Sequence, residues 1–320
     1  MIEKYIHDIY NKKIDHYEGY ESFCYQNCQR IILEYAYGSN AILFINTVPS
    51  IEIEAMDKLR LREKDDFRSL LPSVNKYTNR FYYKDDESIL DDWALHIRRN
   101  YIEDTELKED ADDNAMTVEQ YLHDYVIPQK GEELGATVRS ADITEILISD
   151  LLEFVHQYSV PRYKLKNRSG KNNSQQGTDV IAYKYKNEDK TPNDKDELVA
   201  AEVKATLSNM EYTPIKNAII DSRKDEHRLA RSVNYCRKRL KELGKIEEAE
   251  EVKRFLFKPD NNYRITYVAA GVSSRENVDD AIELGFSGEE LEIRKNELIF
   301  YVHGQKLMEL AHNIYQRCCK

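Results

Sequence analysis

The chain has 320 residues, of which 41% are hydrophobic and 33% charged, so it is long enough and apolar enough to bury a substantial core. This composition excludes an intrinsically disordered chain, because disordered chains are poor in apolar and aromatic residues. The formal net charge of −11 argues against a protein that coats nucleic acid through bulk positive charge, but it is compatible with a local basic groove.

The acidic charge is concentrated in the first part of the chain. Residues 1–130 contain 16 Lys and Arg against 26 Asp and Glu, whereas residues 131–320 contain 31 against 32. No apolar run approaches the roughly eighteen residues of a membrane-spanning helix, and the first residues do not resemble a signal peptide. We therefore expect a cytoplasmic protein with no membrane partner. The five cysteines are scattered and predict buried thiols rather than a disulfide framework.

In the first part, the pattern predicts a helix from Cys24 to Tyr37 and another from Ser88 to Tyr101, which carries the only tryptophan on its buried face. The acidic run 103–114 is typical of a solvated loop or linker. We place a domain boundary near residue 130. Residues 1–130 are thus expected to form a smaller, acidic, mixed N-terminal domain that docks a partner or regulates the second domain. Two further predicted segments are extended chain at Ala41–Ile53 and a helix at Glu54–Phe67.

Residues 131–320 alternate between helical and strand patterns, which predicts an α/β domain with a mixed central sheet flanked by helices. The expected elements, in chain order, are a helix at Asp142–Tyr158, strands at Val160–Leu165, Gly177–Lys186 and Leu198–Thr206, a helix at Ser222–Leu243, a strand at Arg264–Val272, a helix at Asn277–Leu284, a strand at Leu298–His303 and a helix at Gln305–Cys318.

Two of these strands carry charged residues in otherwise apolar sequence. Side chains alternate along a strand, so Glu202 and Lys204 project to one face and Val203 to the other. If the strands form a hairpin, Asp179 lies at the same end of the sheet. Oxygen ligands from Asp179 and Glu202, with the Val203 carbonyl, suit Mg²⁺, and Mn²⁺ could substitute because it accepts the same ligands. Lys204 would orient or help activate a water and offset charge on a phosphate.

A structural interpretation competes with this one. Glu202 and Lys204 could be an ion pair on a half-exposed strand, and Asp179 could simply end a turn after Gly177. The context favours the catalytic interpretation, because two apolar strands joined by a polar loop lie between a long helix and an amphipathic basic helix.

The segment Asp179…Glu202-Val203-Lys204 resembles the PD-(D/E)xK nuclease signature, although Gly177-Thr178 replaces the proline before the first acid. Glu145, on the preceding helix, matches in position the helical glutamate of that superfamily. Asp142-Ile-Thr-Glu145 is also a capping-box pattern, so Glu145 could instead cap its helix. More narrowly, the layout of residues 135–318 resembles the C-terminal domain of the HamA family, the nuclease subunits of the bacterial Hachiman antiphage system. The segments that carry the resemblance are QGTDVIAYK, AAEVKATLS and FYVHGQKLMELAHNIYQR.

The resemblance implies a nuclease-like fold and a Mg²⁺-dependent DNA nuclease, with Asp179, Glu202, Lys204 and Glu145 in catalysis. It also implies an antiphage complex in which a helicase partner, HamB, controls access to DNA. The alternative function is a catalytically silent nuclease-fold module that binds nucleic acid or a defence protein.

Two basic sets are candidates for substrate contacts, since phosphate binding is sequence-independent and salt-sensitive. The first set follows a predicted strand, and the second lies on a helix face that points to solvent unless something docks on it. The first set is Arg162, Lys164, Lys166, Arg168 and Lys171, and the second is Lys224, His227, Arg231, Lys238 and Lys241.

Overall fold

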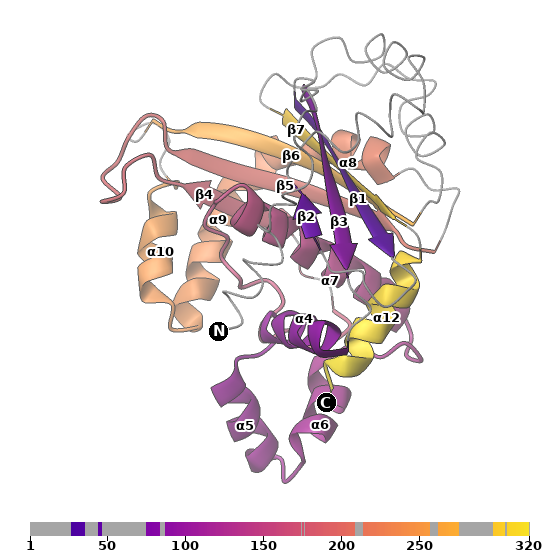
Figure 1. Cartoon of the computed structure of the whole chain (residues 1–320). Helices are drawn as coiled ribbons and strands as arrows, with labels where there is room; N and C mark the ends of the chain where they lie inside the picture. Colours follow the sequence, from indigo (N-terminus) through magenta and orange to yellow (C-terminus); the bar gives the residue numbers. More distant parts are fainter. Residues whose placement is uncertain are drawn as a thin grey trace, which may run out of the picture.

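A computed structural model describes residues 27–35, 44–46, 75–83, 87–173, 175, 177–208, 214–256, 262–274, 297–304 and 306–319. In this part of the chain, seven strands form one mixed sheet in the order β2-β3-β1-β7-β6-β5-β4 (Figure 1). The five inner strands are parallel to one another, and β2 and β4 pair antiparallel at the two edges. The strands are β1 (Asn27–Tyr35), β2 (Phe44–Asn46), β3 (Asn75–Tyr83), β4 (Val180–Lys184), β5 (Glu197–Thr206), β6 (Arg264–Ser273) and β7 (Glu297–Gly304).

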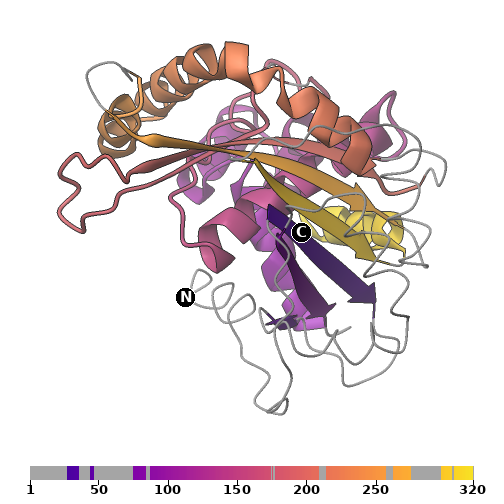
Figure 2. The same ribbon diagram turned by 90° about the horizontal axis from the view of Figure 1, so that it is seen from above.

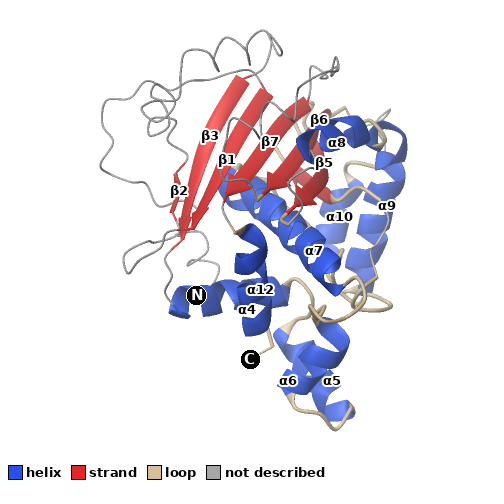
Figure 3. Cartoon of the chain, turned by 90° about the vertical axis from the view of Figure 1, so that its right-hand side faces the viewer, coloured by secondary structure: helices blue, strands red, loops and turns tan. Residues whose placement is uncertain are grey.

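Helices cover both faces of this sheet, which confirms the predicted mixed α/β fold (Figures 2 and 3). One face, the α7 face, packs against α4, α7 and α12, and the other, the α9 face, packs against α8, α9 and α10. The helices are α4 (Glu87–Arg99), α5 (Asp104–Asp113), α6 (Val118–Tyr121), α7 (Gly135–Asp150), α8 (Pro214–Ser222), α9 (Asp225–Glu242), α10 (Ile246–Lys253) and α12 (Leu307–Arg317), with π-helical turns at Leu122–Val126 and Leu151–Val155.

Strand β5 shows how sequence alternation assigns residues to the two faces. Val199 and Val203 are buried against the α7 face, whereas Leu198 and Ala200 are buried against the α9 face. Because successive strand side chains alternate, Glu202 lies on the α9 side of the strand. Glu202 and Lys204 therefore point toward the helices that follow this strand in the chain.

Gly271, in β6, allows α8 to lie directly on the sheet. A Cβ built on Gly271 would be 2.7 Å from the backbone nitrogen of Ile215, at the start of α8, so no side chain fits there. Gly271 is the register partner of Lys204 in β5. The close approach of α8 therefore occurs next to the lysine of the predicted site.

The last described helix, α12, closes the α7 face of the sheet. Ile314 and Tyr315 are fully buried in the core that α12 shares with α4 and α7. The Tyr101 hydroxyl donates to Asp142 Oδ2 at 2.7 Å and lies 2.7 Å from the Tyr315 hydroxyl. A polar contact inside an apolar core thus connects α12 to α7 and to the end of α4.

Several predicted elements in the first part differ from the structure. Where it is described, the predicted helix Cys24–Tyr37 is wrong, since Asn27–Tyr35 is strand β1; a short apolar run is compatible with either element. The acidic run 103–114 is not a linker but contains α5, which buries Leu107 and Ala111 four residues apart. Of the extended segment Ala41–Ile53, β2 is described; the helices predicted at Glu54–Phe67 and Asn277–Leu284 lie outside the described residues.

Other predictions are closer to the structure. The helix predicted at Ser88–Tyr101 is α4, and its Trp93 is 5% exposed. Helix α4 shares one core with α7, but a shared core does not show which segments fold independently, so the boundary near residue 130 stays a prediction. No helix within the described ranges has the length and hydrophobicity needed to cross a bilayer.

A buried charge network joins α4 to the end of α7. Asp150 is fully buried; it accepts a hydrogen bond from Arg162 Nη2 at 2.7 Å and lies 3.0 Å from His96 Nε2. Burial alone would raise the pKa of Asp150, but pairing with His96 and Arg162 lowers it below its ordinary value. The ionised Asp150 carboxylate therefore stabilises the fold at pH values above the ordinary Asp pKa. This stabilisation is lost as the pH falls through the pKa of Asp150 in the folded protein.

We predict that Asp150→Ala lowers the free energy of unfolding by about 3–5 kcal/mol, because it leaves the largely buried Arg162 guanidinium without one of its two carboxylates. Chemical denaturation measures this change at neutral pH. The control is Asp113→Ala on the exposed side of α5, which should change stability by no more than about 0.5 kcal/mol. A loss at Asp150 no larger than that of the control would show that the network does not stabilise the fold.

Candidate active site

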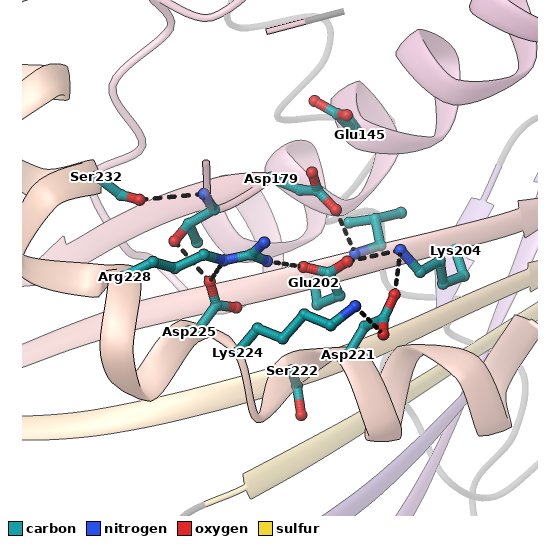
Figure 4. A network of polar contacts seen from close by, with 12 residues as sticks. Glu145, Asp179, Glu202, Lys204, Asp221, Ser222, Lys224, Asp225, Arg228 and Ser232 are labelled. Atoms are coloured by element: carbon teal, nitrogen blue, oxygen red, sulfur yellow. Dashed lines mark hydrogen bonds and ion pairs between the residues drawn. The ribbon is translucent and has the colours of Figure 1, made fainter. Parts of the chain in front are cut away.

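The pairing of β4 with β5 brings the two predicted carboxylates together. Val180 pairs with Ala201, and continuing this antiparallel register by one residue places Asp179 opposite Glu202. Oδ2 of Asp179 accepts a hydrogen bond from the backbone N–H of Val203 at 2.9 Å. The hairpin expected from the sequence is therefore present, and its two acids lie at the end away from the connecting loop. Figure 4 shows both acids.

Lys204 lies between two carboxylates. Its Nζ donates to Glu202 Oε1 at 2.7 Å and lies 3.0 Å from Oδ2 of Asp221, at the end of α8. Burial by itself would lower the pKa of Lys204, but the hydrogen bonds to the two acids raise it above its ordinary value. Lys204 is therefore a fixed ammonium at neutral pH.

Arg228 approaches Glu202 from α9. Its Nη2 donates to Glu202 Oε2, and its Nε donates to Oδ1 of Asp225 at 2.7 Å. Asp225 is fully buried and also accepts from the Thr178 hydroxyl at 2.7 Å, while its Oδ2 is buried without a partner among the described residues. Both oxygens of Glu202 thus face cations, one from β5 itself and one from α9.

Lys164 holds the third acid of the site. Its Nζ lies 3.0 Å from Glu145 Oε2 and donates to Asp179 Oδ1 at 2.9 Å. Burial raises the pKa of Glu145 to about 7, and the nearby charge of Asp179 adds to this against the opposing effect of Lys164. Glu145 points to the same region as Asp179, although it belongs to a helix on the α7 face (Figure 4).

The capping interpretation of Glu145 is wrong. Helix α7 begins at Gly135, so Asp142 and Glu145 lie well inside the helix and have no first-turn amides to cap. Asp142 and Glu145 could form a capping box only if the helix started at Asp142. Glu145 is free to face the site because the helix starts two turns earlier.

The chemistry of Asp179 and Glu202 fits a hard divalent cation. Both offer carboxylate oxygens, which Mg²⁺ prefers. Burial raises the pKa of Glu202, and the charge of Asp179 raises it further, so a bound cation would relieve the crowding of like charge. Within the described residues, no three His, Cys, Asp or Glu side chains stand together as a metal-binding group, so the fit rests on these two acids.

The four predicted substrate contacts are all paired with acids of this chain. The strand predicted at Val160–Leu165 is wrong: residues 160–163 have no regular secondary structure, Lys164 and Leu165 lie in a turn, and an isolated bridge precedes them at Ser159. The phosphate-binding role of the four contacts stays a prediction that requires these pairs to open. Arg162 pairs with Asp150 and Glu153, Lys164 with Glu145 and Asp179, Lys166 with Glu103, and Arg168 with both oxygens of Asp142 at 2.7 and 2.8 Å.

Sequence reasoning missed Asp221 and Arg228. Both lie on the two helices after β5, and the sequence gives no strand partner or motif that would connect them to Lys204 or Glu202. The one available signal was their place in the helices that follow the charged strand.

Comparison with known families agrees with the layout of the second part of the chain. The model of the HamA family matches residues 58–318, well over half of the chain and all the residues of the site described above. No curated protein matches the chain significantly.

The turn before Asp179 depends on a glycine. Gly177 has φ of +118°, which side-chain-bearing residues rarely adopt, and a Cβ there would lie 3.3 Å from Oγ of Ser232. The next residue donates its backbone N–H to the same Ser232 oxygen at 3.2 Å. This close approach connects the start of β4 to α9.

We predict that Gly177→Ala lowers the free energy of unfolding by about 1–2 kcal/mol, because alanine must adopt a strained backbone conformation. Urea denaturation of the purified variants measures this. Gly131→Ala is the matched control, since Gly131 has open space and no positive φ, and it should leave stability unchanged or slightly raised. Equal stabilities of the two variants would remove the strain argument.

Proposed function

The chain belongs to the HamA family of Hachiman antiphage defence proteins, and on this premise we propose that it is a Mg²⁺-dependent nuclease that hydrolyses phosphodiester bonds in DNA. We further propose that its second part has a PD-(D/E)xK nuclease site. The observation that carries the proposal is the meeting of Asp179, Glu202 and Lys204 at one end of the β4–β5 hairpin.

In this proposal Asp179 and Glu202, with the main-chain carbonyl of Val203, hold Mg²⁺. When bound, the ion supplies positive charge against the oxygens of a scissile phosphate. The side chains of the protein do the positioning. Asp179 is held from two sides, by the Val203 N–H and by Lys164, so its orientation is set before any ligand binds.

Lys204 is suited to donate hydrogen bonds rather than to accept a proton. Its pKa lies above the ordinary value because Glu202 and Asp221 both face it, so it carries its proton at neutral pH. An ammonium in this place can orient an attacking water and stabilise negative charge that develops on the phosphate. Asp221 acts through Lys204 as a positioning residue.

Glu145 completes the acidic set from the other side of the sheet. It shares Lys164 with Asp179. In this proposal the Glu145 carboxylate orients the lysine and adds its charge to the catalytic site. The proposed partners, DNA and a HamB-like helicase that controls access to it, rest on the family alone. The proposed regulatory or docking role of residues 1–130 rests on their acidic composition.

One observation favours a catalytically silent module as the second candidate. Every carboxylate oxygen of Glu202 and Asp179 already has a partner within the protein, namely Lys204, Arg228, Lys164 and the Val203 N–H. A domain that only binds nucleic acid could keep such a paired site. Incubation of the purified chain with plasmid DNA and Mg²⁺, with and without EDTA, separates the two candidates.

We predict that Lys204→Ala lowers the cleavage rate about a hundredfold or more, because it removes a transition-state contact. Lys224→Ala is the matched control: Lys224 also pairs with Asp221, but its side chain is mostly exposed, so an effect of only a few-fold is expected. Single-turnover cleavage of labelled DNA measures both rates. Equal losses in both variants would remove the special role of Lys204.

We also predict that Asp179→Asn and Glu202→Gln each weaken Mg²⁺ binding and abolish cleavage, whereas Mn²⁺ supports activity of the unmodified chain. Isothermal titration calorimetry with each metal measures the affinities. Glu226→Gln, an exposed carboxylate on α9, serves as the control and should bind Mg²⁺ as the unmodified chain does. Undiminished Mg²⁺ binding by both site variants would exclude these acids as ligands.

A further inference from the structure

A second concave site lies beside the carboxylates, on the opposite side of Arg228. It is a pocket of about 830 Å³ between α9 and the loop that leads into β4, and we call it the α9 pocket. Its volume is in the upper part of the roughly 300–1,000 Å³ range of pockets that hold small organic ligands. It is therefore large enough for a nucleotide and much larger than a single inorganic ion requires.

The lining of the α9 pocket is positive although the chain as a whole is acidic. Arg228, Arg231 and Arg239 line it, and none of the other lining residues is acidic. Guanidinium groups bind phosphate oxygens through planar, paired hydrogen bonds. The composition of the pocket therefore selects an anionic ligand, and its neutral polar lining provides further hydrogen-bonding groups.

Arg231 is the arginine available to a ligand. Its side chain is exposed, and no hydrogen bond or ion pair joins it to another residue in the described ranges. By contrast, Arg228 contacts Glu202 and Asp225, and Arg239 contacts Glu242 and a backbone carbonyl. A ligand phosphate can therefore bind Arg231 without first breaking an ion pair.

An aromatic surface lies in the same pocket. Tyr235 is 38% exposed, its hydroxyl donates to Gln175 Oε1 at 3.0 Å, and its ring meets the buried ring of Tyr163 edge to face at a centroid distance of 6.1 Å. These two contacts fix the orientation of an exposed ring. A fixed aromatic face beside an unpaired arginine suits a ligand that has both a flat base and a phosphate.

The α9 pocket adjoins the proposed catalytic site through Arg228. Arg228 lines the pocket and also donates to Glu202 (Figure 4). Thr178, which also lines the pocket, directly precedes Asp179 in the chain. A strand whose phosphate lies at the carboxylates can therefore place a neighbouring nucleotide in the pocket. A ligand unrelated to the strand would have to share Arg228 with it.

We infer that the α9 pocket binds one nucleotide unit of the single strand that enters the site, with a phosphate on Arg231 and the base against Tyr235. This inference rests on the proposed nuclease function for its substrate class. It adds a binding subsite and two substrate-binding residues to that function. Loss of the subsite weakens substrate binding, whereas loss of the carboxylates removes cleavage.

The test is fluorescence-anisotropy titration of the full chain in EDTA with short labelled single strands, one of DNA and one of RNA with the same sequence. Arg231→Gln should lower the affinity for the strand about tenfold. It should also make the affinity less sensitive to salt, by about the amount that one phosphate contact contributes. Lys195→Gln is the charge-matched control, because Lys195 is exposed on the β4–β5 loop and outside the pocket, so its affinity should stay near that of the unmodified chain.

The tyrosine is tested in the same assay. Tyr235→Phe keeps the ring and should bind nearly as well as the unmodified chain, whereas Tyr235→Leu removes the ring and should bind several-fold more weakly. Equal affinities of Arg231→Gln and Lys195→Gln, or of the two Tyr235 variants, would overturn the inference. Affinity losses seen only with the RNA strand would also overturn the inference, because it rests on a DNA substrate.

The binding assay also separates this inference from the proposed function. EDTA prevents cleavage, so binding is measured separately from the reaction. If binding in EDTA depends on Arg231 but the strand is not cut when Mg²⁺ is present, the nuclease proposal is overturned and the subsite stands. A strand that is cut with Mg²⁺ but binds Arg231→Gln normally overturns the subsite alone.

Discussion

The confinement of three carboxylates in one partly buried region is the constraint on which the rest of the site depends. Burial raises the pKa of Glu145 and of Glu202, and the nearby charge of Asp179 raises both pKa values further. Such crowding is tolerated only if opposite charge is supplied locally. Lys164, Lys204 and Arg228 supply it, and they come from a loop, a strand and a helix. The charges of the site therefore connect elements from both faces of the sheet.

The sheet makes this convergence possible because the site lies at its edge strand. Next to β4, the helix α7 on one face can reach Asp179 through Lys164, while α9 on the other face reaches Glu202 directly. Deeper in the sheet, a strand would separate the two helices. Gly271 has the complementary role, since it lets α8 lie close enough to β5 for Asp221 to contact Lys204. The close approach of α8 at Gly271 and the pairing of Asp221 with Lys204 thus occur at the same place in the structure.

The sequence was sufficient to locate the β4–β5 hairpin and the acids and lysine at its end, because strand alternation and the polar loop are local signals. It was not sufficient to place Lys164, which pairs with Glu145 and Asp179, or Asp221 and Arg228, because these contacts depend on how helices pack over the sheet. The same limit applies to β1, where an apolar run predicted a helix, and to α5, where charge masked a buried pair of residues. Long-range packing decided each of these cases.

The position of α12 has a consequence for the order in which the protein is synthesised. This helix emerges from the ribosome after every other described element, yet Leu310, Ile314 and Tyr315 fill the core over α4 and α7. Until α12 is made, the apolar surfaces of α4 and α7 lack one of their covering helices. The Tyr101 hydroxyl, which donates to Asp142, then also lacks its contact with the Tyr315 hydroxyl. A nascent chain therefore contains the whole β4–β5 hairpin before it can complete the core behind it. Translation itself delays the assembly of the finished domain.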